Sequence, residues 1–364
     1  MSSADPPGLD TARLRAYLDE HVPGLVAGPL AAEVVAGGRS NLTYLVRDPH
    51  SRWVVRRPPL GHVLPTAHDM AREYRVISAL GPTAVPVPKT ILLCQDPDVL
   101  GGPFYVMEHV PGTPYRSETE LAELGPARTR AIAEALVDTL VELHAVDPGS
   151  VGLADFGRPQ GFLERQLRRW KKQLDASRSR DLPGIERLHE RLAAALPVSA
   201  EATIVHGDYR LDNVLVQAAA SPDQAAADGA TTERAGAKPA KSEVEIMAVL
   251  DWEMSTLGDP LTDLALLIAY AERERIDTGV LPKVSSAPGY PGTDEVIDRY
   301  ARVSGRDVSA LAWYVGFAFF KMAVILEGIY YRFSQGQTVG AGFERIGAAV
   351  VPIVRLGNQT LNNL

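Results

Sequence analysis

The stretch "IVHGDYRLDNVLV", residues Ile204–Val216, places a cluster of His, Asp, Arg and Asn between two short apolar blocks. Apolar, β-branched blocks of this kind predict short strands, and a polar loop between strands lies at the rim of a sheet. Binding and catalytic side chains are often carried on such loops. The stretch therefore predicts a functional loop, with a carboxylate at Asp208 and an amide at Asn213, five positions later.

A second carboxylate follows in "IMAVLDWE", where Asp251 ends an apolar segment. Two carboxylates and an amide suit phosphoryl transfer, with one carboxylate as base or orienting group. The other carboxylate and the amide can bind a hard divalent cation through their oxygens. The kinase catalytic loop has its Asp and Asn at the same spacing, followed by a metal-binding Asp on a separate strand.

On these residues the chain resembles the aminoglycoside phosphotransferase family, a kinase-like family with the signature H-G-D-x-x-x-x-N. It is most similar to the subgroup related to the kinase-like N-terminal domain of acyl-CoA dehydrogenase family members 10 and 11. That similarity lies in "VVRRPPLGHVLPTAHDMAREYRVISAL" and "VLDWEMSTLGDPLTDLA", and it runs in order from about Glu33 to Tyr331. The resemblance implies a bilobal α+β fold. Residues 1–109 would form a nucleotide-binding lobe with an antiparallel sheet and one helix, and residues 110–364 a larger, mainly helical lobe.

The resemblance also assigns roles in the second lobe. Asp208 would accept or orient the proton of a substrate hydroxyl, while Asn213 and Asp251 would bind Mg²⁺ at the phosphates of ATP or GTP. His206 and Asp263 would brace the loop. An Asx turn that merely closes a loop would also explain Asp208 and Asn213, but the third carboxylate in the right order favours the site.

In the first lobe the strand "WVVRR" carries Arg56 where the kinase pattern has a lysine. Arginine can still bind phosphate oxygens and pair with a carboxylate, here Glu73 on the following helix. The alternative is that both are solvated surface charges. "GGRSNLTYLV" occupies the place of the phosphate-covering loop, with Ser40 and Asn41 as candidate nucleotide ligands, although a plain hairpin turn explains its glycines equally well.

The segment "FYVMEHVPG" resembles the hinge between the lobes. Backbone groups of Glu108 and Val110 would bind the adenine edge, with Met107 at the back of the pocket. Because backbone hydrogen bonding requires no particular side chain, this assignment depends on position alone.

The acceptor is expected to be an anionic or acyl small molecule such as a hydroxyacyl-CoA. Arg210, Lys321 and Arg332 are the candidate acceptor-binding residues, since a site for a polycation should be ringed by carboxylates instead. Lys321 and Arg332 can equally extend from a packed helix toward solvent. The alternatives are an aminoglycoside phosphotransferase and a nucleotide-binding module without catalysis. A metal-dependent hydrolase using His206, Asp208 and Asp251 is disfavoured because no second His cluster is present.

The composition is that of a globular protein: 364 residues, 46% hydrophobic, with a net charge of −8 that offers no basic surface to nucleic acid or membrane. A single cysteine, Cys94, is expected in the core and fits a reducing, cytoplasmic location. The apolar stretch from Ala310 to Tyr331 carries Lys321 and Glu327, which favours a buried core helix over a membrane span. Residues 217–242 are low in hydrophobicity and are expected to form a disordered insertion in a hairpin.

Residue patterns place the remaining elements. Strands are expected at 31–37, 42–48, 52–57, 89–95 and 103–110, and helices at 10–20, 66–80, 128–144 and 161–175. Thr66 is the expected N-cap of the second helix.

Overall fold

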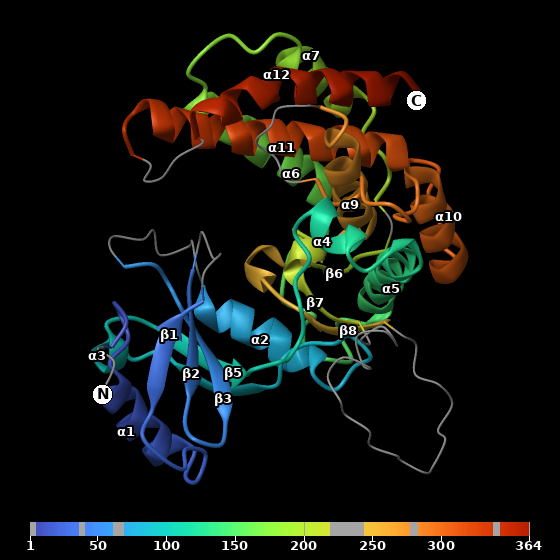
Figure 1. Cartoon of the computed structure of the whole chain (residues 1–364). Coiled ribbons are helices and arrows are strands. Elements are labelled where there is room, and N and C mark those ends of the chain that lie inside the picture. The colour runs from blue at the N-terminus through green and yellow to red at the C-terminus, as the bar shows by residue number, and fades with distance from the viewer. Residues whose placement is uncertain are drawn as a thin grey trace, which may run out of the picture. The chain divides into compact units, whose positions relative to one another are not determined.

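The five strands expected near the N-terminus form one antiparallel sheet in the order β1-β2-β3-β5-β4 (Figure 1). The computed structural model describes residues 5–35, 41–60, 69–199, 201–218, 244–276, 283–337 and 343–363. The sheet belongs to the first of two compact units, which comprises Met1–Gly112 and Met247–Ser255. Its strands are β1 (Ala31–Val34), β2 (Leu42–Arg47), β3 (Arg52–Arg57), β4 (Thr90–Cys94) and β5 (Phe104–Glu108), with the short helix α3 (Pro97–Leu100) between the last two.

Alternation along β3 sends its two arginines to opposite faces of the sheet. Trp53 and Val55 face the core on one side, and Arg57 shares their face. Arg57 is 4% exposed and donates to the carbonyls of Gly8 and Leu100, which ties the N-terminal segment to the sheet. Arg56 therefore faces the other side.

Helix α1 (Thr11–His21) covers the first face, close to its expected bounds. Asp10 caps it by accepting from the N–H groups of Ala12 and Arg13, and Leu14 and Leu18 are buried against the sheet. Cys94 is fully buried in the same cluster, as expected.

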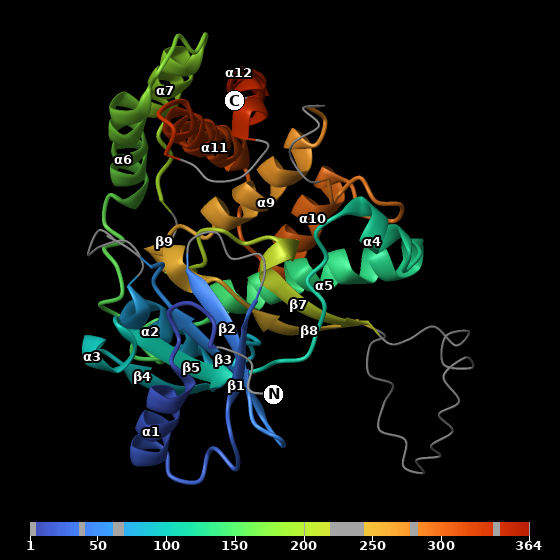
Figure 2. The ribbon, with the colours of Figure 1, turned by 60° about the vertical axis from the view of Figure 1, so that its left-hand side comes forward.

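Helix α2 (Met70–Leu80) packs against β4 and β5 and is drawn beside the sheet in Figure 2. The expected start at Thr66 is wrong, because Asp69 is the N-cap and accepts from the N–H of Arg72. Residues 61–68 lie outside the described residues. Glu73 belongs to the buried stripe of this helix, which also contains four apolar residues: Met70, Val76, Ile77 and Leu80.

The second unit comprises Thr113–Ile246 and Thr256–Leu364 and is mainly helical. The α+β fold class expected from the sequence is thereby confirmed. Its helices are α4 (Glu118–Ala122), α5 (Pro126–Ala145), α6 (Phe162–Ser177), α7 (Ile185–Ala194), α9 (Leu261–Arg273), α10 (Thr293–Ser304), α11 (Leu311–Ser334) and α12 (Phe343–Thr360). The short strands and turns are β6 (Thr203–Val205), η1 (Leu211–Asn213), β7 (Val214–Ala218), β9 (Thr256–Gly258) and η3 (Leu361–Asn363), with β8 (Val244–Val249) and η2 (Trp252–Met254) leading into and out of the first unit.

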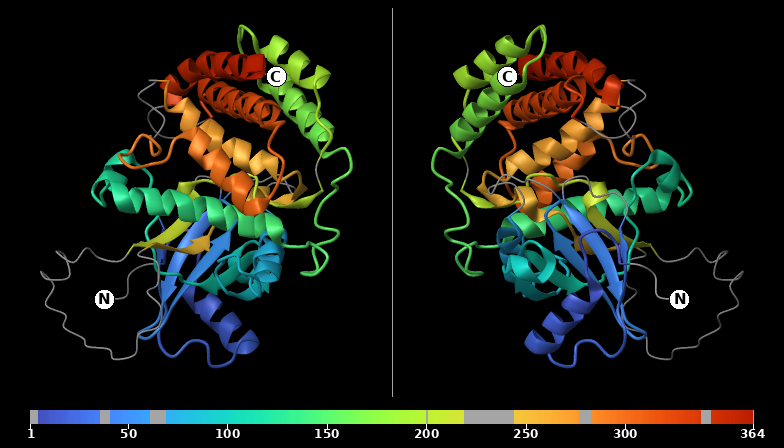
Figure 3. Two further views of the ribbon diagram at one scale, coloured as in Figure 1. Left: turned by 90° about the vertical axis from the view of Figure 1, so that its right-hand side faces the viewer. Right: turned by 90° about the vertical axis from the view of Figure 1, so that its left-hand side faces the viewer.

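Helix α11 is the core helix of the second unit. It is long and apolar enough to cross a membrane, but 78% of its most apolar window is buried inside the protein. Helices α6, α7, α9 and α12 pack against it, and α12 runs beside it in Figure 3. The expected buried helix at 310–331 is thus present.

Two expected boundaries differ in the structure. Gln217 and Ala218, placed in the insertion by composition, are the last residues of β7, which pairs with β8; the rest of the insertion, from 219 onward, lies outside the described residues. Met247–Ser255, expected in the C-terminal lobe, groups with the first unit because Asp251 and Glu253 contact residues of that unit.

Candidate active site

The loop after β6 holds Asp208 by both of its carboxylate oxygens. The Asn213 amide donates to Oδ2 at 3.1 Å and to the Asp208 carbonyl at 2.9 Å, which closes the turn into η1. The Tyr270 hydroxyl donates to Oδ1 at 2.7 Å from the last turns of α9. Burial, followed by the charge of Asp208, raises the pKa of Tyr270 well above its ordinary value, so the phenol stays a donor. The carboxylate is therefore fixed in one orientation.

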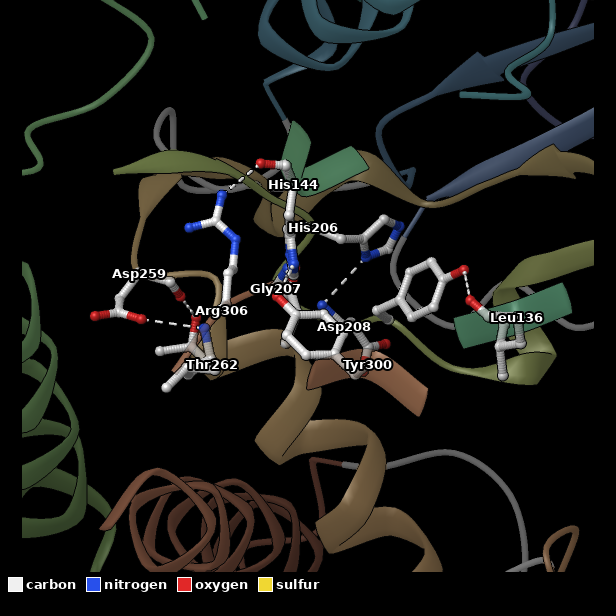
Figure 4. A network of polar contacts seen from close by, with 12 residues as sticks. Leu136, His144, His206, Gly207, Asp208, Asp259, Thr262, Tyr300 and Arg306 are labelled. Atoms are coloured by element: carbon white, nitrogen blue, oxygen red, sulfur yellow. Dashed lines mark hydrogen bonds and ion pairs between the residues drawn. The ribbon is translucent and has the colours of Figure 1, made fainter. Parts of the chain in front are cut away.

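Asp263 braces this loop from the first turn of α9, as expected. It accepts from the backbone N–H of His206 at 2.6 Å and of Gly207 at 2.8 Å. His206 is fully buried, and its Nδ1 accepts from the Asp208 N–H at 3.2 Å (Figure 4). Gly207 has φ of 85°, a left-handed conformation that glycine adopts without strain. These contacts set the backbone that presents Asp208.

Behind Asp263 lies a buried chain of polar side chains that the sequence did not reveal. His144 lies 3.4 Å from Asp263 through Nε2, and its Nδ1 accepts from the Tyr300 hydroxyl at 2.8 Å. Burial lowers the pKa of His144, so it stays neutral and donates to Asp263. Burial opposes ionisation of Asp263, but the bonds from His144 and the loop outweigh it and lower its pKa. Figure 4 also shows Arg306, which donates to the His144 carbonyl.

The three basic residues expected to bind the acceptor occupy different surroundings. Arg210 lies 3.8 Å from Asp208 and pairs with Asp212 at 3.1 Å. Lys321 donates to the Gly207 carbonyl at 2.8 Å and lies over the Trp170 ring, so its ammonium is engaged with the loop backbone. Arg332 is exposed in the last turn of α11. Among the three, Arg210 is the one whose guanidinium lies beside the Asp208 carboxylate.

In the first unit, the predicted pair between Arg56 and Glu73 is present. Arg56 Nη2 lies 3.0 Å from Glu73 Oε1 and 3.0 Å from Asp251 Oδ1. The side chains of Arg56 and Glu73 are 12% and 1% exposed, so the reading as solvated surface charges is wrong. Burial raises the pKa of Glu73 to about 7, although Arg56 opposes the rise. Burial also lowers the pKa of Arg56, but Glu73, Tyr105 and Asp251 outweigh it and keep the guanidinium charged.

Asp251 adopts an unusual backbone conformation at the end of β8. Its φ of 68° is the sole positive value of a non-glycine residue within the described ranges. Asp tolerates this left-handed region better than most residues, and such conformations often occur at functional positions. The conformation turns the chain into η2, where Glu253 accepts from the Asn41 amide at 3.1 Å.

The expected nucleotide-binding residues are only partly described. Ser40 lies outside the described residues. Asn41 is 4% exposed, and its Oδ1 has no hydrogen-bond partner within the described chain, which leaves a buried acceptor. Met107 is buried in β5. The Glu108 N–H donates to the Lys89 carbonyl at 2.9 Å, which leaves at most its own carbonyl for adenine. Val110 follows the strand in an irregular segment.

The expected metal ligands have the right chemistry for a hard cation. The Asn213 amide nitrogen makes both hydrogen bonds to Asp208. The Asn213 amide oxygen therefore remains available as an acceptor. Asp251 uses Oδ1 for Arg56 and retains Oδ2. Oxygen ligands of this kind suit Mg²⁺, which takes few protein ligands and shares the phosphates of its nucleotide. The described residues contain no group of three or more His, Cys, Asp or Glu side chains placed for a metal ion.

Comparison with known proteins identifies a family of phosphotransferases. A model of the phosphotransferase enzyme family matches residues 31–226. Acyl-CoA dehydrogenase family member 11 of Homo sapiens is 34% identical over 357 residues, which cover 96% of this chain and 43% of that protein. Family member 10 of Mus musculus is 34% identical over 338 residues, covering 91% and 29%. The chain thus spans less than half the length of these relatives.

Solved structures show the fold. A candidate aminoglycoside phosphotransferase from Ralstonia eutropha is 31% identical, with a TM-score of 0.78 over 97% of this chain and 98% of that one. The GDP complex of aminoglycoside 2'-phosphotransferase-IIIa is 13% identical, with a TM-score of 0.60 over 98% and 100% of the two chains. The kinase-like fold expected from the sequence is confirmed by these similarities.

Proposed function

The chain belongs to the phosphotransferase enzyme family, and on that premise we propose that it moves the γ-phosphoryl group of ATP or GTP to a hydroxyl of a small molecule. The observation that carries the proposal is the fixed carboxylate of Asp208, held by Asn213 and Tyr270 on a loop braced by Asp263. Phosphoryl transfer depends on positioning and charge stabilisation more than on covalent chemistry. A carboxylate fixed in this way suits the orientation of an attacking hydroxyl.

In this mechanism Asp208 accepts a hydrogen bond from the acceptor hydroxyl and aims its oxygen at the γ-phosphorus. The proton passes to Asp208 as the new oxygen–phosphorus bond forms and the bond from the γ-phosphorus to the β,γ-bridging oxygen breaks, which releases ADP or GDP. Asn213 and Asp251 would each offer an oxygen to Mg²⁺, which supplies charge neutralisation at the phosphates when bound. Arg56, kept charged by Glu73, contributes a guanidinium for the nucleotide phosphates. Ser40, Asn41, Met107, Glu108 and Val110 are the remaining nucleotide-binding candidates.

For the acceptor we favour an anionic or acyl molecule such as a hydroxyacyl-CoA. Two observations support this choice: the guanidinium of Arg210 beside Asp208, and the relatives named as acyl-CoA dehydrogenase family members. The second candidate acceptor is an aminoglycoside, because a neighbour with 31% identity carries that name. Carboxylates around the acceptor site would favour binding of a cationic aminoglycoside, whereas basic groups favour binding of an anionic hydroxy acid.

The test is release of ADP or GDP from the magnesium nucleotide across hydroxyacyl-CoAs, free hydroxy acids and aminoglycosides. The Asp208→Asn variant should bind nucleotide as well as the wild type but transfer phosphate several orders of magnitude more slowly. The matched control is Asp298→Asn, which removes an exposed carboxylate on α10 and should leave the rate unchanged. Chelation with EDTA should abolish turnover, and excess Mg²⁺ should restore it. Retained turnover in Asp208→Asn would remove that residue from its role.

A further inference from the structure

A pocket in the second unit begins beside the catalytic-loop residue Arg210 and runs along the end of α9. It is partly open to solvent. Its apolar walls come from Leu211, Leu267, Ala271 and Val284, and its polar groups from Arg210, Asp212, Tyr270, Arg273, Glu274, Ser285 and Tyr290. One wall, Tyr270, is the residue that donates to Asp208. The pocket is therefore connected to Asp208, whose carboxylate is proposed to orient the acceptor hydroxyl, through the Tyr270 side chain.

Of the two arginines that line this pocket, Arg210 pairs with Asp212, and Arg273 has no ion pair within the described chain. It is 7% exposed, and its Nε has no hydrogen-bond partner there. Its guanidinium lies 4.7 Å from the centre of the Tyr270 ring, a cation–π contact that supports the charge without satisfying its N–H groups. Arg210 lies 5.1 Å from the same ring centre. A buried guanidinium with an unused donor is costly unless an oxyanion or carbonyl binds it.

The two carboxylates in the pocket are already engaged. Glu274 accepts from the backbone N–H groups of Val284, Ser285 and Ser286 and from the Ser286 hydroxyl. Asp212 pairs with Arg210 at 3.1 Å. These carboxylates are therefore already engaged and are not available to a cationic amino sugar. The Arg273 Nε, in contrast, has no partner within the described chain and can donate a hydrogen bond to a carboxyl oxygen.

We propose that Arg273 binds the carboxyl-derived oxygen of the acceptor, so that this pocket selects hydroxyacyl compounds whose hydroxyl lies only a few bonds from that oxygen. The inference rests on the proposed function and names the group that its acceptor must carry. The short spacing follows because a single tyrosine side chain separates Arg273 from Asp208. The apolar walls accommodate the carbon chain between the two ends. A free carboxylate and a thioester carbonyl both offer the required oxygen.

The experiment compares three acceptors with the same hydroxyl-bearing chain: the free hydroxy acid, its CoA thioester and the alcohol that lacks the carboxyl carbon. Binding is measured by calorimetry without nucleotide, and KM and kcat are measured with magnesium ATP. The variants are Arg273→Gln and Arg273→Lys. The matched control is Arg275→Gln, two residues further along, because Arg275 is exposed and pairs only with Glu272 among the described residues.

For the wild type we expect the acid or the thioester to bind more tightly than the alcohol. Arg273→Gln should weaken binding of that acceptor and raise its KM by about tenfold to hundredfold, as expected for loss of a charge-assisted hydrogen bond. Arg273→Lys should restore part of the affinity. The KM for ATP and the affinity for the alcohol should stay unchanged, and Arg275→Gln should stay within about twofold of the wild type. A larger effect on the acid than on the thioester identifies the carboxylate as the natural group, and the reverse identifies the carbonyl.

A residue with a purely structural role would behave differently. Arg273→Gln would then lower the melting temperature and weaken all three acceptors and ATP together, which would overturn the inference. Because the unsatisfied guanidinium is itself unfavourable when the pocket is empty, we expect the Gln variant to melt at the wild-type temperature or above it.

The two proposals can fail separately. If the acids bind through Arg273 but no acceptor is phosphorylated, the pocket assignment holds and the transfer reaction does not. If only the alcohol or an amino sugar is bound and phosphorylated, the transfer reaction holds and the pocket assignment is overturned.

Discussion

Arg56 Nη2 lies 3.0 Å from Glu73 Oε1, on the face of the sheet that α2 covers. The position on the strand and the position on the helix are both explained by sequence periodicity. Alternation along β3 turns Arg56 away from the face of the sheet that α1 covers, and Glu73 lies on the buried stripe of α2. The pair therefore lies buried between the sheet and α2.

Replacing Arg56 with Met should lower the free energy of unfolding by about 3 kcal/mol, because it leaves Glu73 buried without its partner. Urea unfolding measures the change. The control is Arg52→Met on the same strand, where the side chain is exposed and the loss should be below about 0.5 kcal/mol. The double variant Arg56→Met with Glu73→Leu should recover part of the stability. If Arg56→Met is as stable as the control Arg52→Met, the pair of Arg56 and Glu73 contributes little to stability.

The raised pKa of Glu73 predicts a specific dependence of stability on pH. The carboxyl is protonated in both states below about pH 4.3, its unfolded pKa, and ionises in the folded protein only near pH 7. Between these values the unfolded chain releases a proton that the folded chain retains, so stability falls as pH rises. Relative to Glu73→Gln, the wild type should lose up to about 4 kcal/mol across this window and nothing more above it.

Melting temperatures of the wild type and Glu73→Gln, measured from pH 4 to pH 8, test this dependence. A constant difference between the two proteins would show that Glu73 is ionised throughout, as a strong ion pair with Arg56 would make it.

Tyr270→Phe should reduce kcat by about tenfold to hundredfold, because Asp208 loses one of the donors that fix its carboxylate. The KM for nucleotide should not change. Initial rates at saturating substrate are the measurement, with Tyr331→Phe on α11 as the control. A wild-type kcat in the Phe variant would mean that Asn213 suffices to orient the carboxylate.

Lys321→Met distinguishes loop positioning from acceptor binding. Because Lys321 donates to the Gly207 carbonyl, we expect kcat to fall while the acceptor KM is retained. Burial lowers the pKa of Lys321, so the neutral Met should cause little loss of thermal stability. A rise in acceptor KM with unchanged kcat would return Lys321 to the acceptor-binding role that the sequence suggested.

Sequence patterns were sufficient where a side chain's place depends on its own strand or helix. Period-two alternation predicts the strands of the first sheet, and the order of Asp208, Asn213 and Asp251 predicts a kinase-like loop. The bracing role of Asp263 comes from the family resemblance. The confirmed fold class and family follow from these motifs. The nucleotide, metal and acceptor roles remain predictions.

Tyr270 and Arg273 could not be found in this way. Both lie near the end of an apolar helix whose pattern indicates only burial. Tyr270 contacts Asp208, and Arg273 lines a pocket with residues 210–212 and 284–290, all of which are distant from α9 in the sequence or beyond its end. His144 is hidden similarly at the end of α5. Long-range contacts also decide that Met247–Ser255 joins the first unit, which composition does not indicate.

The left-handed backbone of Asp251 limits which substitutions can report on its charge. Ala or Glu at this position would have to adopt a conformation that disfavours residues with an ordinary side chain by roughly 1–2 kcal/mol. Asn tolerates that conformation as Asp does, so Asp251→Asn removes the negative charge and leaves the chain path intact. Mutational scans that rank Asp251 by its alanine variant would mix a backbone penalty with a chemical one.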